Sequence, residues 1–250
     1  MVRLHTALKA ASLWAMSYAS GVHTKYTRFA VVGHARTGSN LLLDVFRSSP
    51  EVEMFHEIFS ADNRVIGQGF NEHINRLYAG YPRCIRAVGC KIFYNHLTNQ
   101  EWSEFEQHKE FKIIHLIRRN RLRTLVSLAI AFKTDVWLQT NFRKKVPLEK
   151  KRVYLDPESL FTQIMQIESW ESQTRARFAH RDVLEICYED LVTDFEAVAS
   201  EAIGFVGAKR WNPNRIGYKK QNPEPLDQLI SNFPEVSHAL KNTPWEQYLE

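Results

Sequence analysis

Cysteine is scarce in this 250-residue chain, and the few cysteines present are not arranged for a covalent or metal-binding role. Cys84, Cys90 and Cys187 are odd in number, lack Cys-x-x-Cys spacing and have no cluster of histidines beside them. A disulfide framework and a zinc site are therefore excluded as organising features. We expect a reducing, cytoplasmic compartment.

The chain also lacks an apolar run long enough to cross a bilayer. The most apolar N-terminal stretch, residues 7–21, follows Arg3 as in a secretory signal, but Lys9 and several other polar residues interrupt it. We expect this stretch to form a helix with one apolar side, and a removed signal is the less favoured alternative. The predicted organisation is an N-terminal helical extension over residues 1–27 and a single domain over residues 28–250.

Charge is abundant and unbalanced. The chain has 33 Lys and Arg against 28 Asp and Glu, a formal net charge of +5. Such a balance suits a polyanionic ligand, nucleic acid or an anionic membrane surface, and charge alone does not choose among them. With 44% apolar residues, the length fits one α/β domain with a substantial core.

Apolar segments alternate with helical patterns along the chain. Strand-like runs occupy residues 29–32, 85–93, 111–117 and 183–188, and helical material follows each of them. This order predicts βαβ units, and therefore an α/β fold of the P-loop type with three layers and a central parallel sheet flanked by helices. Helix starts are predicted at Thr98 with Glu101, at Thr193 with Glu196 and at Asp156 before Pro157; the last helix should extend to about Phe178.

The turn after the first of these runs predicts an anion site. Residues 29–40 run from an apolar strand through Gly33 and Gly38 into a helix, whose first N–H groups have no intrahelical partner. The spacing of these glycines is that of a nucleoside-triphosphatase P-loop, but Ser39 and Asn40 stand where that motif needs Lys and then Ser or Thr. Arg36 supplies positive charge instead. The combination favours transfer from a nucleotide without a metal ion.

A second anion site is predicted where the 111–117 strand ends. Arg118 and Arg119 lead into a helix that begins near Asn120. Its apolar stripe, from Leu122 to Ile130, faces the core, so Ser127 points the other way. Ser127 lies within about 20° of Asn120 around the helix, so one anion could meet both Arg119 and Ser127. A surface arginine and an exposed serine are the favoured interpretation if this pair is taken alone.

Taken together, these motifs resemble the sulfotransferases that use 3′-phosphoadenosine-5′-phosphosulfate (PAPS). The loop Arg36–Asn40 and the segment Leu116–Ser127 are most similar to bacterial carbohydrate sulfotransferases of the trehalose 2-sulfotransferase and nodulation-factor groups. Tyr188-Glu189-Asp190-Leu191 and the C-terminal segment from Gly217 follow in the family's order. The resemblance covers roughly residues 28 to 250.

The resemblance implies a role for several residues. Arg119 and Ser127 would bind the 3′-phosphate, helped by Lys219 and Lys220, and Tyr188 would lie near the adenine. The 5′-phosphosulfate would be held by the first loop, namely by Arg36, Thr37, Gly38, Ser39 and Asn40. The co-substrate is then PAPS and the product is 3′,5′-adenosine bisphosphate (PAP), with no metal.

The chemistry needs a base for the acceptor hydroxyl and positive charge on the leaving phosphate. Glu57 stands where the resembling bacterial enzymes place a glutamate base; His96 and His56 are rivals. Arg36 and Lys91 are the candidates for stabilising the departing charge. A surface carboxylate at Glu57 and a lysine pointing into solvent at Lys91 stay open as ordinary alternatives.

Three functions are weighed. The leading one is sulfuryl transfer from PAPS to a hydroxyl, on a sugar or glycolipid acceptor. A P-loop kinase or nucleotide hydrolase is the first alternative. A noncatalytic binder of anions or nucleic acid, using the basic loop over residues 140–152, is the second alternative. Phe142 is the one aromatic residue among the basic residues of that loop, and this scarcity of rings for base stacking counts against binding of single-stranded nucleic acid. We expect residues 60–82 and 132–155 to form the walls of the acceptor site. A homodimer is a further possibility, because members of the family that the chain resembles often dimerise.

Overall fold

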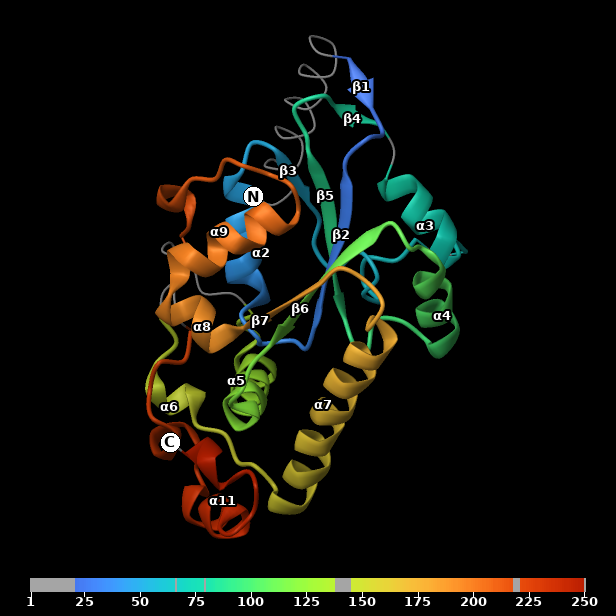
Figure 1. Ribbon diagram of the computed structural model, residues 1–250. Coiled ribbons are helices and arrows are strands. Elements are labelled where there is room, and N and C mark those ends of the chain that lie inside the picture. Colours follow the sequence, from blue (N-terminus) through green and yellow to red (C-terminus); the bar gives the residue numbers. More distant parts are fainter. Residues whose placement is uncertain (1–20, 66, 79, 138–144, 218–220, 250) are drawn as a thin grey trace.

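A five-stranded parallel sheet forms the centre of the molecule (Figure 1). The computed structural model describes residues 21–65, 67–78, 80–137, 145–217 and 221–249. In spatial order the strands are β3 (Val52–Met54), β5 (Ala87–Phe93), β2 (Thr27–Gly33), β6 (Phe111–Ile117) and β7 (Val183–Cys187). A short antiparallel ribbon pairs β1 (Val22–His23) with β4 (Tyr81–Pro82).

Alternation along β2 builds two cores, one on each face of the sheet. Phe29 and Val31 pack on one face, whereas Ala30 and Val32 pack on the other, because successive strand residues point to opposite sides. The first core is covered by α2 (Ser39–Ser48), α8 (Tyr188–Thr193) and α9 (Phe195–Phe205); the second by α3 (Phe70–Leu77) and α4 (Asn99–Gln107). Figure 1 shows these two sets of helices on opposite sides of the strands. The predicted three-layer α/β fold is confirmed.

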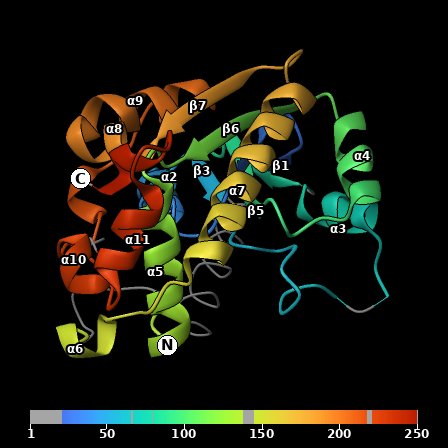
Figure 2. The same cartoon turned by 90° about the horizontal axis from the view of Figure 1, so that it is seen from below.

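A third core lies beyond the carboxyl edge of the sheet. It joins α5 (Arg121–Thr134) and α7 (Pro157–Arg177) to the C-terminal part of the chain. That part consists of α10 (Leu226–Leu229), α11 (Phe233–Leu240) and the 3₁₀ turn η2 (Glu246–Leu249). A further 3₁₀ turn, η1 (Pro213–Arg215), lies against α2 instead. Figure 2 looks onto this edge and shows α5 with α7 on one side and α10 on the other. Helices therefore frame the edge at which parallel sheets bind ligands.

Most predicted boundaries agree with the structure. The four strand-like runs are β2, β5, β6 and β7. Thr98 and Glu101 form both hydrogen bonds of a capping box, and Asp156 caps α7. The start predicted at Thr193 is wrong: α8 continues through Thr193, and Asp194 precedes α9 without a side-chain cap. The predicted N-terminal helix lies outside the described residues.

The basic loop predicted over residues 140–152 is only partly described. Leu148–Lys151 forms the short helix α6. Of its described cations, Lys145, Lys150 and Arg152 are exposed. Lys151 is 5% exposed, with its ammonium 2.7 Å from Glu224 Oε1 and 2.9 Å from the Gln221 carbonyl oxygen, so its charge is matched inside the fold. In the described part of the chain, no helix combines the length and the apolarity that crossing a membrane requires.

Candidate active site

The turn between β2 and α2 contains two residues with a positive φ, a backbone conformation that few residue types adopt readily. Gly38 has φ 86°, and a Cβ there would lie 2.4 Å from Cδ2 of Tyr188, so both the dihedral angle and the close approach require glycine. Arg36 also has a positive φ, 69°, which is uncommon for a residue with a side chain. The turn thus presents the N–H groups at the start of α2 toward open space beside Tyr188.

The side chain of Arg36 connects the turn to segments far away in the sequence. Its Nε donates to Ser127 Oγ at 3.0 Å, and Nη1 donates to the Trp137 carbonyl oxygen at 2.6 Å. Nη2 donates to Gln221 Oε1. The contact with Ser127, which is buried and not exposed as predicted, joins the turn to one member of the second predicted anion site. The turn and Ser127 therefore face a common space.

That space is a pocket, which we call the arginine pocket. The space between its walls is about 580 Å³, counted together with its open mouth. No Asp or Glu is among the described residues that line it. The principal lining residues are Arg36, Gly38, Ser39, Asn40, Arg118, Arg123, Ser127, Tyr188 and Asn222. Three guanidinium groups without a lining carboxylate make the pocket a site for an anion.

Arg118 is the least satisfied of these arginines. It is 8% exposed, its guanidinium lies over the Tyr188 ring at 4.6 Å, and Nη1 donates to the Arg36 carbonyl oxygen at 3.3 Å. Its buried Nε has no hydrogen-bond partner among the described residues, since Glu189 Oε1 is 4.0 Å away. Burial lowers the pKa of Arg118. A buried donor without an acceptor costs free energy, so this group is ready for a ligand oxygen.

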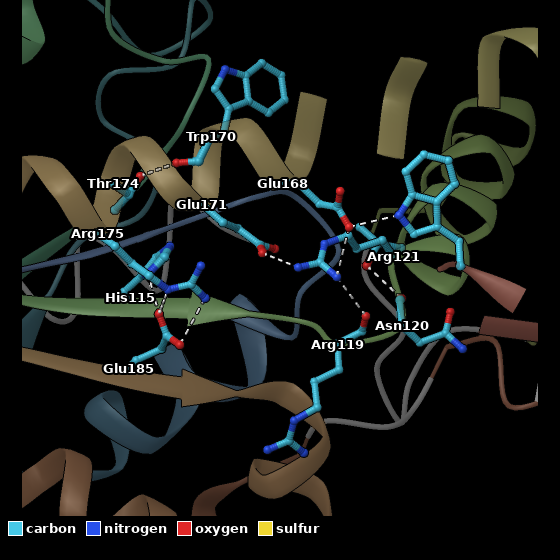
Figure 3. Close-up of polar contacts among 12 residues, drawn as sticks. His115, Arg119, Asn120, Arg121, Glu168, Trp170, Glu171, Thr174, Arg175 and Glu185 are labelled. Carbon is cyan, nitrogen blue, oxygen red and sulfur yellow. Dashed lines mark hydrogen bonds and ion pairs between the residues drawn. The ribbon is translucent and has the colours of Figure 1, made fainter. Parts of the chain in front are cut away.

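Arg119 does not share this environment. Its side chain is 55% exposed and bonds both oxygens of Asp190, at 2.7 and 2.5 Å. Figure 3 shows it pointing away from its neighbour Arg121. Consecutive residues at the end of an extended strand face opposite sides, so when Arg118 faces the pocket Arg119 cannot. The structure therefore does not bring Arg119 and Ser127 together, and the role of Arg119 toward a 3′-phosphate stays a prediction.

Lys91 occupies the centre between the turn and the loop after β3. Its ammonium lies 2.7 Å from Glu57 Oε1, 3.1 Å from Asn40 Oδ1 and 3.4 Å from Ser39 Oγ. The residue is 1% exposed, so it does not point into solvent. Burial lowers its pKa, against the opposing effect of Glu57. A lysine from β5 thus stands beside the two loop positions where a P-loop would carry its own Lys and hydroxyl, which sequence spacing could not indicate.

Glu57 and His96 face each other next to this lysine. His96 Nε2 is 3.9 Å from Glu57 Oε2, while His96 Nδ1 accepts a hydrogen bond from the Phe93 N–H at 3.1 Å. Burial lowers the pKa of His96 to about 4, against the raising effect of Glu57. The imidazole is therefore neutral near pH 7 with its proton on Nε2, the nitrogen that faces Glu57. The nitrogen of His96 that faces Glu57 therefore carries a proton and has no free lone pair on that side.

The remaining predicted residues are spread around this centre. Thr37 donates to the His34 carbonyl oxygen at 2.8 Å within the turn, and Tyr188 forms a wall of the arginine pocket. His56 is exposed. Lys219 and Lys220 lie outside the described residues. Among the described residues, no group of three or more His, Cys, Asp or Glu side chains is placed to hold a metal ion.

A second set of charges lies beneath α7 and is matched internally (Figure 3). Arg121 Nη2 is 2.6 Å from Glu171 Oε2, and Arg175 Nε is 2.7 Å from Glu185 Oε2. His115, fully buried on β6, connects Glu185 Oε2 at 2.9 Å with the Tyr94 hydroxyl at 2.7 Å. We call these six residues the α7 network. Its charges hold α7 on the sheet.

Comparisons with known proteins confirm the resemblance predicted from the sequence. Nodulation protein H of Rhizobium meliloti (strain 1021) is 25% identical over 237 residues, covering 89% of this chain and 94% of that protein. Nodulation protein H of Rhizobium tropici is 23% identical over 234 residues, covering 89% and 92%. A sulfotransferase structure from Alicyclobacillus acidocaldarius aligns over 90% of this chain and 94% of that one, with 16% identity and a TM-score of 0.48. No family model matches the chain.

Proposed function

We propose that this chain is a sulfotransferase that moves the sulfuryl group of PAPS to the hydroxyl of an acceptor, without a metal ion. The observation that carries the proposal is the arginine pocket, in which three arginines meet a P-loop-like turn that lacks the P-loop lysine and hydroxyl. The similarity to Nodulation protein H over most of the chain supports it. The donor supplies the sulfuryl group, and PAP is what remains.

The residues present fit such a donor. Arg118 Nε and Asn222 Oδ1, which both belong to residues lining the arginine pocket, are buried polar atoms without partners among the described residues. We assign the 5′ end of the nucleotide to the turn at Arg36–Asn40 and the adenine to the side of Tyr188. For the 3′-phosphate we favour Arg118 with Ser127, and Arg119 is the alternative implied by the family resemblance.

For the chemical step, Glu57 accepts the proton of the acceptor hydroxyl. Lys91 neutralises charge that develops beside the start of α2, and Arg36 adds a second positive group there. His96 stands beside Glu57, with Nε2 3.9 Å from Glu57 Oε2, and we assign the base to Glu57 in place of His96. A sugar or glycolipid is the acceptor that we propose, and cytoplasmic location and a homodimer remain part of the proposal.

The test compares nucleotides as stabilising ligands. PAP should raise the melting temperature of the protein more than ATP with magnesium does, because stabilisation follows affinity for the folded state. AMP, which has no 3′-phosphate, should give a smaller shift than PAP. Equal shifts for PAP and for ATP with magnesium would favour the kinase or hydrolase alternative. A shift for all polyanions that disappears with moderate salt would favour a noncatalytic binder.

A further inference from the structure

A second pocket opens between α4 and α7, outside the arginine pocket. It holds about 570 Å³ including its mouth. Its walls include two tryptophans, three side-chain amides and one arginine, which we call the aromatic–amide pocket: Asn95, Asn99, Trp102, Trp170, Gln173 and Arg177. None of these residues has a role in the donor site described above.

The polar groups of this pocket divide into those that are already bonded and those that are available. Arg177 forms an ion pair with Glu106, and its guanidinium lies 5.2 Å from the Trp102 ring. The Trp102 Nε1–H donates to the Tyr94 carbonyl oxygen at 3.4 Å. By contrast, the side-chain amides of Asn95 and Asn99 hydrogen-bond to no other described residue, and both residues are exposed. The pocket thus offers aromatic surface and free amides, with its one cation already paired.

This composition selects a chemical class of ligand. An amide both donates and accepts, as a hydroxyl does, so several amides suit a ligand with many hydroxyls. An aromatic ring offers an apolar face to the C–H side of a sugar ring. An anion would meet only Arg177, which Glu106 neutralises, and an apolar ligand would desolvate the amides without replacing their hydrogen bonds. An uncharged saccharide fits best.

One ring contact and one pair of consecutive residues join the aromatic–amide pocket to the reaction centre. The Trp170 ring stacks on His34 of the anion-binding turn, with ring centroids 5.8 Å apart and planes at 29°. On the opposite wall, Asn95 lines the pocket while the next residue, His96, faces Glu57. Asn95 and His96 are consecutive, so the wall of the pocket continues directly into the residue that faces Glu57.

We propose that the aromatic–amide pocket is the acceptor subsite and that it binds an uncharged saccharide, with a sugar ring against Trp170 and hydroxyls bonded to Asn95, Asn99 and Gln173. This proposal rests on the proposed sulfuryl transfer, because it supplies the acceptor of that reaction. It departs from the walls predicted over residues 60–82 and 132–155.

The test measures saccharide binding without nucleotide, so that it does not depend on turnover. Trehalose, maltose, cellobiose and N,N′-diacetylchitobiose are the probes, followed by saturation-transfer NMR and by tryptophan fluorescence, with p-nitrophenol and glucose 6-phosphate alongside. We expect at least one disaccharide to bind at millimolar concentration or better. Gln173→Trp should fill the pocket and weaken that disaccharide at least tenfold, and Gln173→Ala should weaken it by about three- to tenfold through one lost hydrogen bond.

The matched control lies on the same helix. Gln163 and Gln173 are both exposed on α7, and each donates to the serine four residues earlier, Ser159 at 3.3 Å and Ser169 at 2.9 Å. Gln163 is not among the pocket residues, so Gln163→Trp and Gln163→Ala should leave saccharide affinity within twofold of wild type. Binding that survives both Gln173 variants, absence of disaccharide binding, or preference for p-nitrophenol or glucose 6-phosphate would overturn the subsite. None of these results bears on the shift of the melting temperature by PAP, which tests the donor site separately.

Discussion

The arginine pocket and the α7 network use the same cation and differ in where its charge goes. In the α7 network Arg121 and Arg175 each face a carboxylate at 2.6 and 2.7 Å. In the arginine pocket Arg36, Arg118 and Arg123 line one space with no carboxylate among the described lining residues. Three like charges around one space repel one another, whereas the two charges of each pair in the network attract. The arginines that gather around a shared space, and not those that face a carboxylate at hydrogen-bond distance, therefore indicate the anion site here.

The strongest contrast exchanges a glutamate for glutamine at two places, Glu57 beside Lys91 of the proposed reaction centre and Glu171 of the α7 network. Glu57→Gln should lower turnover by about 10²–10⁴-fold, because a positioned base contributes that much, while PAP affinity is retained. Glu171→Gln, its counterpart under α7, should keep turnover within about twofold when both are assayed below their melting temperatures. Turnover can be followed by transfer of radiolabelled sulfate from PAPS to the acceptor. Full activity of Glu57→Gln would move the base elsewhere, and His96→Asn would then be the next variant.

Arg121→Met tests the network as a support for the fold. Glu171 is 2% exposed, and burial raises its pKa, against the lowering effect of Arg121. Removing Arg121 leaves a buried carboxylate without its main partner, which should cost about 3–5 kcal/mol in the free energy of unfolding measured with urea. The double variant Arg121→Met with Glu171→Leu should recover much of that loss. A loss of under about 1 kcal/mol in the single variant would mean that the pair is not a support.

The network should also respond to pH through His115. Burial lowers the pKa of His115 from 6.5 to about 4, against Glu185, which raises it. The unfolded chain therefore binds the extra proton between these values, so the free energy of unfolding should fall by about 3 kcal/mol as the pH drops from 6.5 to 4. Burial also lowers the pKa of His96 to about 4, so the informative quantity is the difference between wild type and His115→Gln. Between pH 4 and 6.5, His115→Gln should reduce the slope of the free energy of unfolding against pH by the equivalent of nearly one proton. The control His238→Gln, at an exposed position, should leave that slope unchanged. Equal slopes for wild type and His115→Gln would refute the assignment.

The smallest expected effect separates two adjacent arginines. Arg118→Met should weaken PAP by about 10- to 100-fold through loss of a charge-assisted hydrogen bond, and should weaken AMP much less if this arginine binds the 3′-phosphate. Its neighbour Arg119→Ala removes a residue paired with Asp190 and should change either affinity by under about threefold. Isothermal titration calorimetry with PAP and with AMP measures these affinities for both variants and for wild type. The reverse ranking would restore Arg119, the residue that the family resemblance implies.

Local features of the fold were predictable because they depend on neighbours in the sequence. The runs that became β2, β5, β6 and β7, the cap at Thr98 and the turn at Gly38 all follow from spacing within a few residues. The strand β3 has three residues, too few to show the alternation of apolar and polar residues by which a strand is predicted. The helix start predicted at Thr193 was wrong because α8 continues through that residue. Sequence similarity supplied Glu57, which no local pattern distinguishes from a surface carboxylate.

By itself, then, the sequence determined an α/β sheet, an anion-binding turn without the P-loop lysine, and the residue types of a donor site. Only the tertiary structure decided that Lys91 stands beside Ser39 and Asn40, that Arg118 and not Arg119 faces the arginine pocket, and that α4 and α7 enclose tryptophans and amides. The reason is geometric. Hydrogen bonding and hydrophobic period act over a few residues of chain, whereas the partner of a charge and the walls of a pocket are fixed by packing among segments far apart in sequence.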